Sequence, residues 1–137
     1  MIALAYFSTA AAVMNEDGLR EIVIRSRQNN VGKGVTGMLC HYEGSFLQFL
    51  EGEDAAVTEI FTAISSDARH NSILEVYRAP ITERVFGDWT MAMVKPDQIG
   101  PEHQAFTKAL RQVELVGNAK HRRSLEPFLD AFRAWVR

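Results

Sequence analysis

The sequence predicts an α+β fold, in which two helices cover one face of a mixed β-sheet. Three observations lead to this prediction. Apolar and β-branched runs of strand length alternate with segments in which apolar residues recur every three or four positions. The order of these segments is strand, helix, strand, strand, helix, strand, strand. Two further amphipathic segments follow after residue 100, and they provide cover for the second face of the sheet.

The first part of the chain contains three predicted strands and one helix. Residues 2–8 form a continuous apolar run, which is typical of a central strand covered on both faces. Apolar residues at helical spacing then predict a helix that ends at Asn29 and Asn30, just before two glycines. Residues 36–42 and 45–51 are predicted as the next two strands, because a Glu-Gly turn separates two strand-forming runs.

The next part contains a second helix and two strands. Asp54 is expected to cap this helix at its N-terminus. The apolar residues at helical spacing that predict it are Val57, Ile60, Phe61 and Ile64. After a break at residues 71–72, residues 73–77 are predicted as the fourth strand and residues 85–94 as a fifth. The first six elements therefore have the ferredoxin-like βαββαβ order, and the fifth strand is an addition to that core.

Two amphipathic segments in the tail are predicted as helices. The first begins at Pro101, and the second includes Phe128 and Phe132. Both are too short to be stable alone, so we expect them to cap the open face of the sheet or to form a dimer contact. We accordingly divide the chain into a core at residues 1–95 and a C-terminal helical cap and output segment at residues 96–137.

Composition argues against several classes of protein. The chain has 137 residues, a formal net charge of −2 and no extended basic block, so nucleic acid is not an expected partner. Its single cysteine, Cys40, cannot form an internal disulfide. No apolar run approaches the roughly 20 residues of a membrane span, and the N-terminus lacks the pattern of a signal peptide. We therefore expect a soluble cytoplasmic protein with no membrane partner.

Two hydrogen-bonding side chains lie in strands that are otherwise apolar. Gln48 is at the centre of the run at residues 46–50, and Tyr6 lies in the first strand. A buried carboxamide left without partners costs about 1–3 kcal/mol, so another protein group or a bound polar ring must meet it. Together with Asn29 and Asn30 at the helix exit, these residues can converge on a planar heterocycle with carbonyl and ring-nitrogen edges.

Other motifs have simpler structural explanations. Residues 32–37 match G-x-G-x-x-G in letters, but a helix precedes them and a strand follows, which reverses the dinucleotide-binding arrangement. The four histidines lack metal-ligand spacing, and no motif supports a Ser-His-Asp hydrolase. Taken alone, Arg69 and His70 are explained by favourable charge at a helix C-terminus, the alternative being contact with a polar ligand edge. Core packing alone explains Trp89 and Met91.

Several motifs taken together resemble one family, the BLUF domain, a blue-light sensor that uses flavin. The resemblance covers roughly residues 1–95, and the spacing of Tyr6, Asn30 and Gln48 fits it. In order, the motifs that carry it are Leu4-Ala5-Tyr6-Phe7-Ser8, Ser26-Arg27-Gln28-Asn29-Asn30, Gly34-Val35-Thr36-Gly37-Met38-Leu39, Phe46-Leu47-Gln48-Phe49-Leu50-Glu51-Gly52, Asp67-Ala68-Arg69-His70 and Phe86-Gly87-Asp88-Trp89-Thr90-Met91. This combination is much more specific than any single motif.

The resemblance implies a photochemical role for two residues. Tyr6 is expected to donate an electron and then a proton to the excited flavin, and Gln48 to bridge the Tyr6 hydroxyl and the N5/O4 edge of the flavin. Rotation or tautomerisation of Gln48 would change the hydrogen-bond network and cause a small red shift while the flavin returns to its oxidised form. Because no substrate is consumed, the resemblance implies a switch rather than an enzyme.

The resemblance also implies which residues surround the cofactor and which report its state. Besides Tyr6 and Gln48, the expected cofactor contacts are Ser8, Ser26, Asn29, Asn30, Arg69 and His70. Trp89 and Met91 are expected to lie on the strand that passes the signal to the tail. The expected cofactor is FAD, with FMN as the alternative, and no metal is expected.

The implied output is a movement of the tail helices, which would act through a homodimer or higher oligomer, or on a separate downstream protein. Two other classes of function remain open. One is a flavin-free interaction module that keeps the fold. The other is a small acylphosphatase-like hydrolase, although the glycine-rich turn does not open a helix as a phosphate-binding loop does.

Overall fold

A computed structural model describes the chain at residues 1–10, 15–42, 44–66, 70–97, 100–116, 126–128 and 130. The elements, in chain order, are β1 (Ile2–Ala10), α1 (Glu16–Val31), β2 (Thr36–Tyr42), β3 (Ser45–Gly52), α2 (Asp54–Ser65), β4 (His70–Pro80), β5 (Ala92–Val94) and α3 (Pro101–Val116). This order matches the predicted series of strands and helices. In the described residues, no helix is both long enough and apolar enough to span a membrane.

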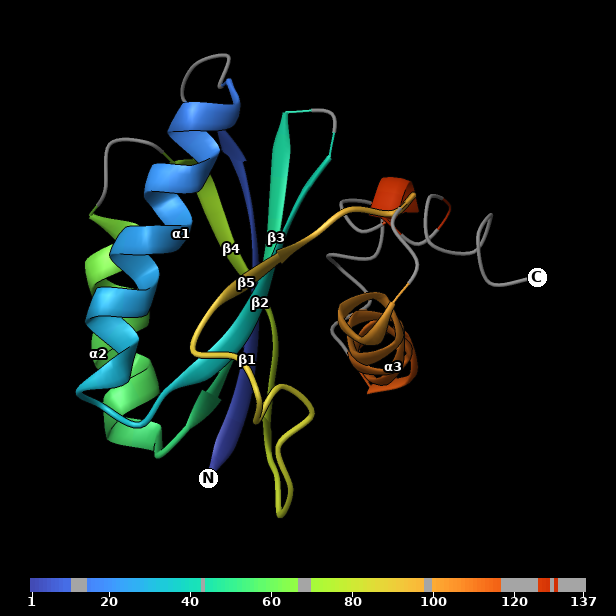
Figure 1. The fold of residues 1–137 in the computed structure, drawn as a ribbon. Helices are drawn as coiled ribbons and strands as arrows, with labels where there is room; N and C mark the ends of the chain where they lie inside the picture. Colours follow the sequence, from blue (N-terminus) through green and yellow to red (C-terminus); the bar gives the residue numbers. More distant parts are fainter. Residues whose placement is uncertain are drawn as a thin grey trace.

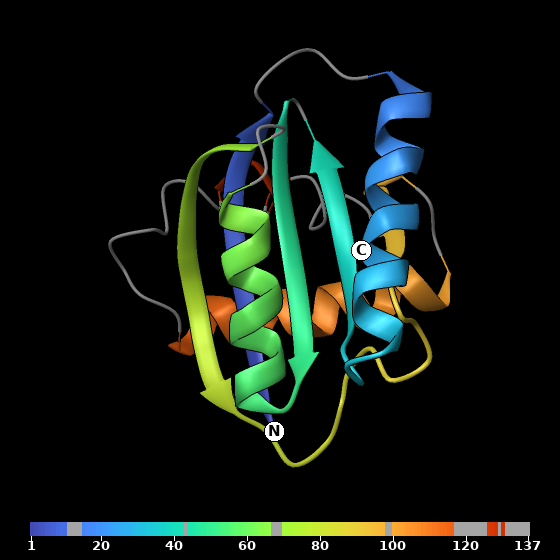
Figure 2. The same cartoon turned by 90° about the vertical axis from the view of Figure 1, so that its left-hand side faces the viewer.

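The strands form one mixed sheet in the order β4-β1-β3-β2-β5. Antiparallel pairing joins β1 to β3 and β4, and β2 to β3, whereas β5 runs parallel to β2. Helices α1 and α2 lie side by side along one face of the sheet, and α3 crosses the strands on the opposite face (Figures 1 and 2). The predicted α+β fold is therefore confirmed, including a first tail helix that covers the open face.

The sheet separates two hydrophobic cores. The core on the α1 and α2 side contains, among others, Leu4, Leu19, Ile22, Val57 and Met91. The core on the α3 side contains, among others, Phe49, Phe86, Phe106, Leu110 and Phe128. Because successive side chains of a strand point to opposite faces, neighbouring residues of β1 and β3 contribute to different cores. Both faces are thus apolar, as expected for central strands.

Register places two polar positions of the central strands next to each other. Tyr6 of β1 pairs with Gln48 of β3, and Gln48 pairs in turn with Leu39 of β2. Two residues along β1, Ser8 pairs with Phe46 of β3. The first and third strands, which are 42 residues apart at this point, therefore bring the predicted photochemical pair together by sheet pairing alone.

Two predicted strand boundaries were wrong. Strand β4 runs from His70 to Pro80, so residues 71–72 are part of it rather than a break. Strand β5 comprises only Ala92–Val94, and most of the predicted strand at residues 85–94 is irregular. The reason lies in the backbone partners of this segment: the amides of Val85 and Phe86 bind a side chain, and the Trp89 amide closes a turn onto the Phe86 carbonyl.

The predicted cap of α2 was also wrong. Glu53 is the N-cap residue, and its side chain makes no capping bond. Asp54 is instead the first helical residue, where its carboxylate accepts a hydrogen bond from Thr58 one turn later. A carboxylate in the first turn still stabilises the helix through the positive end of its dipole.

The tail agrees with its prediction where the structure describes it. Helix α3 begins at Pro101, and its apolar residues Phe106, Leu110 and Val113 are buried against the sheet. Residues 126–128 and 130 are helical. Phe128 is buried and packs against the rings of Phe7 and Tyr42. The rest of the second predicted tail helix, including Phe132, falls outside the described residues.

Candidate functional site

The centre of the candidate site is a hydrogen bond between two buried side chains of the central strands. The Tyr6 hydroxyl donates to Oε1 of Gln48, and Nε2 of Gln48 lies 3.3 Å from the thioether sulfur of Met91. Tyr6 and Gln48 are 1% and 2% exposed. Both ends of the carboxamide are therefore engaged, but a thioether is only a weak acceptor. The Nε2 end is accordingly free to exchange Met91 for a stronger acceptor.

A second buried carboxamide stands at the end of α1. Asn30 is 1% exposed, and its Nδ2 donates to the Thr90 carbonyl oxygen at 2.8 Å. Its Oδ1 is buried and has no hydrogen-bond partner among the described residues. An orphaned buried acceptor is costly, so this atom favours a ligand that presents a donor. The imide N–H of an isoalloxazine ring is such a donor.

Segment 89–91 is held by three hydrogen bonds, two from α1 and one from β2. Gly37 N donates to the Trp89 carbonyl oxygen at 3.0 Å, Asn30 Nδ2 to that of Thr90, and Arg27 Nε to that of Met91 at 2.7 Å. Sequence reasoning missed Arg27. Its position three residues before Asn30 would have placed the two on one helix face. The three bonds hold the backbone from which the Met91 side chain reaches Gln48.

Trp89 and Met91 have different surroundings, although they are only two residues apart. Met91 is 1% exposed and belongs to the core on the α1 and α2 side. Trp89 is half-buried and packs against the α3-side core. The segment therefore contacts both cores, which places it between the Tyr6–Gln48 pair and the core that includes α3.

Position 37 requires glycine because the backbone of β3 comes very close to it. A Cβ built at this position would overlap the Phe49 carbonyl oxygen and lie 3.1 Å from the Met91 methyl carbon. The glycine-rich turn also contains Gly34 with a positive φ of 67°, a conformation that glycine adopts readily. The structural interpretation of these glycines is therefore confirmed.

Two of the remaining predicted site residues lie near Tyr6 or Asn30, and the others do not share a buried position with them or are not described. Ser8 is buried two residues from Tyr6 on the same face of β1, and Ser26 is half-buried one helical turn before Asn30. Asn29 is exposed, because consecutive helix residues point about 100° apart. The backbone of His70 pairs with Ala10 of β1, but its side chain lies outside the described part of the chain, as does the whole of Arg69.

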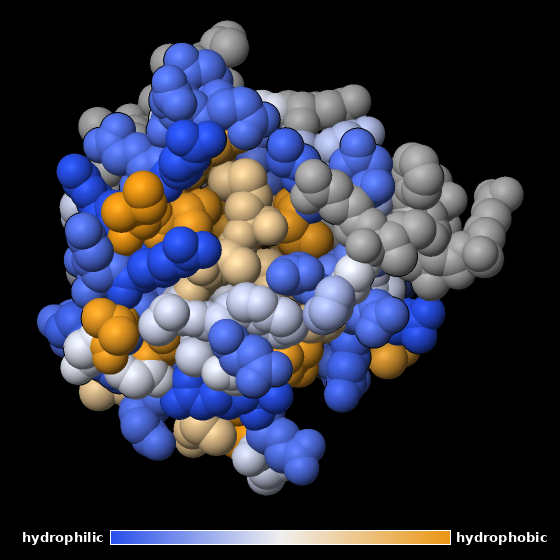
Figure 3. All heavy atoms as spheres, in the orientation of Figure 1, coloured by the Kyte–Doolittle hydropathy of each residue, from blue (hydrophilic) through white to orange (hydrophobic). Residues whose placement is uncertain are grey.

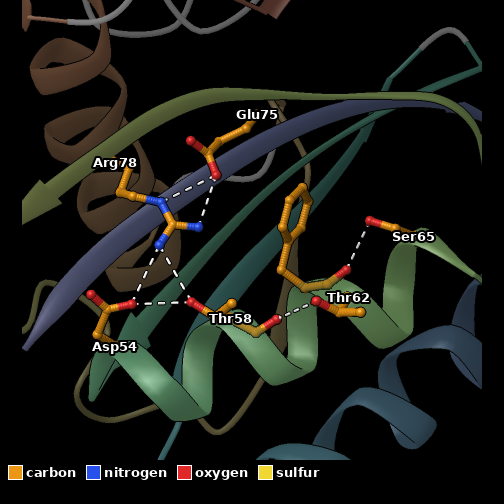
Figure 4. Close-up of polar contacts among 7 residues, drawn as sticks. Asp54, Thr58, Thr62, Ser65, Glu75 and Arg78 are labelled. Carbon is orange, nitrogen blue, oxygen red and sulfur yellow. Dashed lines mark hydrogen bonds and ion pairs between the residues drawn. The ribbon is translucent and has the colours of Figure 1, made fainter.

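Helix α2 forms the other side of the site. The Phe61 ring of α2 contacts the Tyr6 ring, with a centroid separation of 5.6 Å. At the start of α2, Arg78 of β4 binds Asp54 and Thr58, and also Glu75 of its own strand (Figure 4). This network joins α2 to the edge of the sheet, and so helps to place Phe61 against Tyr6.

The site consists of neutral donors and acceptors rather than metal ligands. Within the described ranges, no group of three or more His, Cys, Asp or Glu side chains is close enough to hold a metal ion. Hydroxyl and carboxamide groups in an apolar setting fit the carbonyl and nitrogen edges of a flavin ring. Buried Cys40 points to the other core, and burial raises the pKa of its thiol.

Comparison with known proteins shows the family to which the chain belongs. Residues 1–92 match the family model described as BLUF, sensors of blue light using FAD. Among curated proteins, the chain is 33% identical over 97 residues to photoactivated adenylate cyclase subunit beta of Euglena gracilis, covering 70% of this chain and 11% of that protein. It is 38% identical over 87 residues to the alpha subunit, covering 64% of this chain and 8% of that protein. The chain thus spans about a tenth of the length of these relatives.

Solved structures give the same result. A dark-state structure of BlrB, described as a BLUF protein, has a TM-score of 0.68 and 30% sequence identity, covering 95% of this chain and 94% of that one. A bacterial light-regulated adenylyl cyclase has a TM-score of 0.66 and 28% identity, covering 93% of this chain but 36% of that one. The chain therefore belongs to the BLUF family of blue-light sensors, which use a flavin.

Proposed function

We propose that Tyr6 and Gln48 are the photoactive pair of this sensor, and that Asn30 helps to hold the flavin ring beside them. The observation that carries the proposal is the two-ended hydrogen bonding of Gln48, to the Tyr6 hydroxyl at Oε1 and to the Met91 sulfur at Nε2. A buried carboxamide with one strong and one weak partner can change its arrangement without leaving a charged group unsatisfied.

When bound, the flavin supplies blue-light absorption and a strong electron acceptor in its excited state. Tyr6 then gives up an electron and its hydroxyl proton, and later regains both, so that no net oxidation of the protein occurs. The loss of that proton removes the donor that holds Oε1 of Gln48. Gln48 rotates or tautomerises, and its Nε2 leaves the weak Met91 acceptor for a stronger one. The Tyr6–Gln48–Met91 arrangement is thus the element that has two states.

The remaining cofactor contacts are proposed on two grounds, their placement in the structure and the family motif. Ser8 and Ser26 lie on the faces of β1 and α1 that also carry Tyr6 and Asn30. Asn29, Arg69 and His70 are assigned by the family motif alone. The exposed position of Asn29 suits contact with an outer edge of the ring.

We propose FAD as the flavin. The description of the matching family names FAD, whereas one related solved structure is that of Klebsiella pneumoniae BlrP1 with FMN. Heating the purified protein releases a non-covalent flavin, and mass spectrometry of the supernatant distinguishes the two. FMN as the dominant species would overturn this part of the proposal.

We further propose that the chain has no catalytic activity of its own and signals through residues 96–137. Its similarity to BlrB, described as a BLUF protein, over 95% of this chain supports this. The output would reach a second copy or a separate protein. In Figure 3, hydrophobic side chains form a band across a mainly hydrophilic surface, and Ile24 of α1 is 46% exposed. Light scattering after size-exclusion chromatography, in darkness and under blue light, tests whether the protein forms an oligomer and whether light changes it.

The photochemical proposal is tested by visible absorption before and after blue light. Wild-type protein should show a small, reversible red shift of the flavin bands. The Tyr6→Phe variant should retain flavin and lose the shift, because the electron and proton donor is gone. A matched control is Tyr42→Phe, since Tyr42 packs on the other core and should leave the shift unchanged. A full red shift in Tyr6→Phe would refute the role of Tyr6, and a wild-type protein that binds no flavin would refute the site.

A further inference from the structure

A buried carboxylate lies on the same strand as Gln48 but on the opposite face of the sheet. Glu51 is 2% exposed and lines a cavity of about 360 Å³, whose walls include Phe86 and the α3 residues Lys108 and Gln112. Gln48 is three residues earlier in β3 and contacts Tyr6 and Met91 of the other core. Strand β3 therefore carries the photoactive amide on one face and this carboxylate on the other.

The Glu51 carboxylate binds two successive backbone amides. Val85 N donates to Oε2 at 2.8 Å, and Phe86 N donates to Oε1 at 2.7 Å. Each oxygen therefore has its own charge-assisted donor, an arrangement stronger than a pair of neutral bonds. The adjacent Arg84 guanidinium binds Thr36 Oγ1 at 2.8 Å and the Gly34 carbonyl oxygen at 2.8 Å. Residues 84–86 are thus fastened to the sheet by side chains instead of by strand pairing.

The segment held in this way leads directly to Met91. A turn from the Trp89 amide to the Phe86 carbonyl oxygen joins the two parts at 3.1 Å. At its far end, the Met91 sulfur is the partner of Gln48 Nε2. Segment 85–91 is therefore attached to β3 at both ends, to Glu51 on the α3 side and to Gln48 on the α1 and α2 side.

The same segment also contacts α3. The buried Phe86 ring packs on Phe49 with a centroid separation of 5.5 Å, and Phe49 packs edge-on against Phe106 of α3 at 5.3 Å. Close-packed aromatic rings transmit displacement because no free volume separates them.

We infer that Glu51 is a positioning residue for the light signal: its carboxylate holds Val85 and Phe86 on β3, so that a change at Gln48 and Met91 reaches α3 through Phe86. This inference rests on the proposed roles of Tyr6 and Gln48. Without the two amide bonds, segment 85–91 could respond to Gln48 independently of α3. The signal would then stop at Met91.

Glu51→Gln tests this role because it preserves size but replaces one acceptor oxygen by an NH₂ donor. One of the two backbone amides then faces a donor and loses its bond. The matched control is Glu53→Gln, the same change two residues away at an exposed N-cap whose side chain makes no capping bond. Hydrogen exchange of the flavin-loaded full chain, in darkness and under blue light, measures how light changes the protection of the α3 amides. The red shift in the absorption spectrum measures the photochemistry.

Both variants should keep the red shift, since neither residue touches Tyr6 or Gln48. In Glu51→Gln the light-dependent difference in α3 exchange should fall by about fivefold or more, the equilibrium effect of losing roughly 1 kcal/mol of hydrogen bonding. Glu53→Gln should match wild type. A normal red shift with an undiminished α3 response in Glu51→Gln overturns the inference. Absence of a red shift in the wild-type protein would instead refute the proposed photochemistry.

A second measurement needs no variant. In wild-type protein, the Val85 and Phe86 amides, resolved by NMR, should stay protected from exchange in darkness and under blue light, because their bonds to Glu51 must hold while the signal passes to α3. If blue light removes the protection of both amides while α3 still responds, Glu51 does not transmit the signal. This result would stand even if Glu51→Gln failed to fold.

Discussion

The two faces of the sheet are built from different kinds of contact. On the α1 and α2 side, polar side chains are embedded in the apolar core: Tyr6, Ser8, Asn30 and Gln48. Three of them, Tyr6, Asn30 and Gln48, form hydrogen bonds with one another or with segment 89–91. On the α3 side, the core is built of apolar side chains, among them the aromatic rings of Phe49, Phe86, Phe106 and Phe128. The α1 and α2 face thus adds hydrogen bonds with exchangeable partners to its apolar packing, whereas the aromatic rings of the α3 face are held by filled volume.

Because of this difference, the contacts that can switch are not the ones that contribute most to stability. A hydrogen bond contributes about 1 kcal/mol net, so rearranging one on the α1 and α2 side changes little of the total free energy of folding. Removal of a buried aromatic ring on the α3 side costs several times as much. The molecule can therefore change state on one face while the other keeps the fold intact. Four measurements test this contrast, from the largest expected effect to the smallest.

The Phe106→Ala variant should give the largest loss of stability. The Phe106 side chain is fully buried and packs edge-on against Phe49, and a Phe→Ala change in a core costs about 3–5 kcal/mol. Urea unfolding of the flavin-loaded protein measures the difference. Leu115→Ala, at a position that is 77% exposed in the same helix, should change stability by no more than about 0.5 kcal/mol. A loss of less than about 1 kcal/mol in Phe106→Ala would contradict the assignment of stability to this face.

The Gly37→Ala variant should disturb both faces at once. The added methyl overlaps the Phe49 carbonyl oxygen and approaches Met91, so strand β3 or segment 89–91 must shift. We expect a destabilisation of about 1–3 kcal/mol, together with a changed red shift because Met91 touches Gln48. In contrast, Gly32→Ala meets nothing within 4 Å at a helical φ of −77° and should be neutral or slightly stabilising. Equal stability of the two variants would rule out this close approach.

The pH dependence of stability should reveal the buried carboxylate of the α3 face. Burial raises the pKa of Glu51, and the bonds from Val85 and Phe86 and the Arg84 charge offset this only in part. The folded state therefore binds this proton more tightly than the unfolded chain. This group consequently lowers the free energy of unfolding as pH rises from about 4 to its raised pKa, with no further loss above it.

Urea unfolding over a series of pH values, with Glu51→Gln and Glu53→Gln compared, isolates this contribution. The Glu51→Gln profile should lack the decrease, and the Glu53→Gln profile should retain it. A decrease of the same size in all three proteins would assign it to other groups. Glu51 would then not be the source of the pH dependence.

The Arg78→Ala variant should have the smallest effect. Arg78 bonds Asp54 and Glu75 at the rim of the α1 and α2 side (Figure 4), but its side chain is 34% exposed. Surface ion pairs contribute about 0–1 kcal/mol and are screened by salt. Unfolding at low and high NaCl concentration should show a small difference from wild type that shrinks with salt. A larger, salt-independent loss would mean that this network does more than join α2 to β4.

Local patterns predicted the regular elements well. Tyr6 and Gln48 were identified because each interrupts an apolar run, and alternation along β1 and β3 puts both on one face. The predicted strand at residues 85–94 failed for the opposite reason. Its apolar and aromatic residues suit a strand, but its backbone groups bind Glu51, Asn30 and Arg27 instead. These partners lie 34 to 64 residues away in the sequence, so no local pattern predicts them.

The sequence by itself determined the order of strands and helices, the buried faces and the polar residues that interrupt them, because periodicity follows from backbone geometry and the burial of apolar side chains. Only the tertiary structure decided that Met91 would be the second partner of Gln48, that Trp89 would face the other core, and that Glu51 would hold residues 85–86. An irregular segment takes its shape from whatever hydrogen-bond partners the rest of the fold presents to it. Those partners exist only after the sheet and helices have assembled.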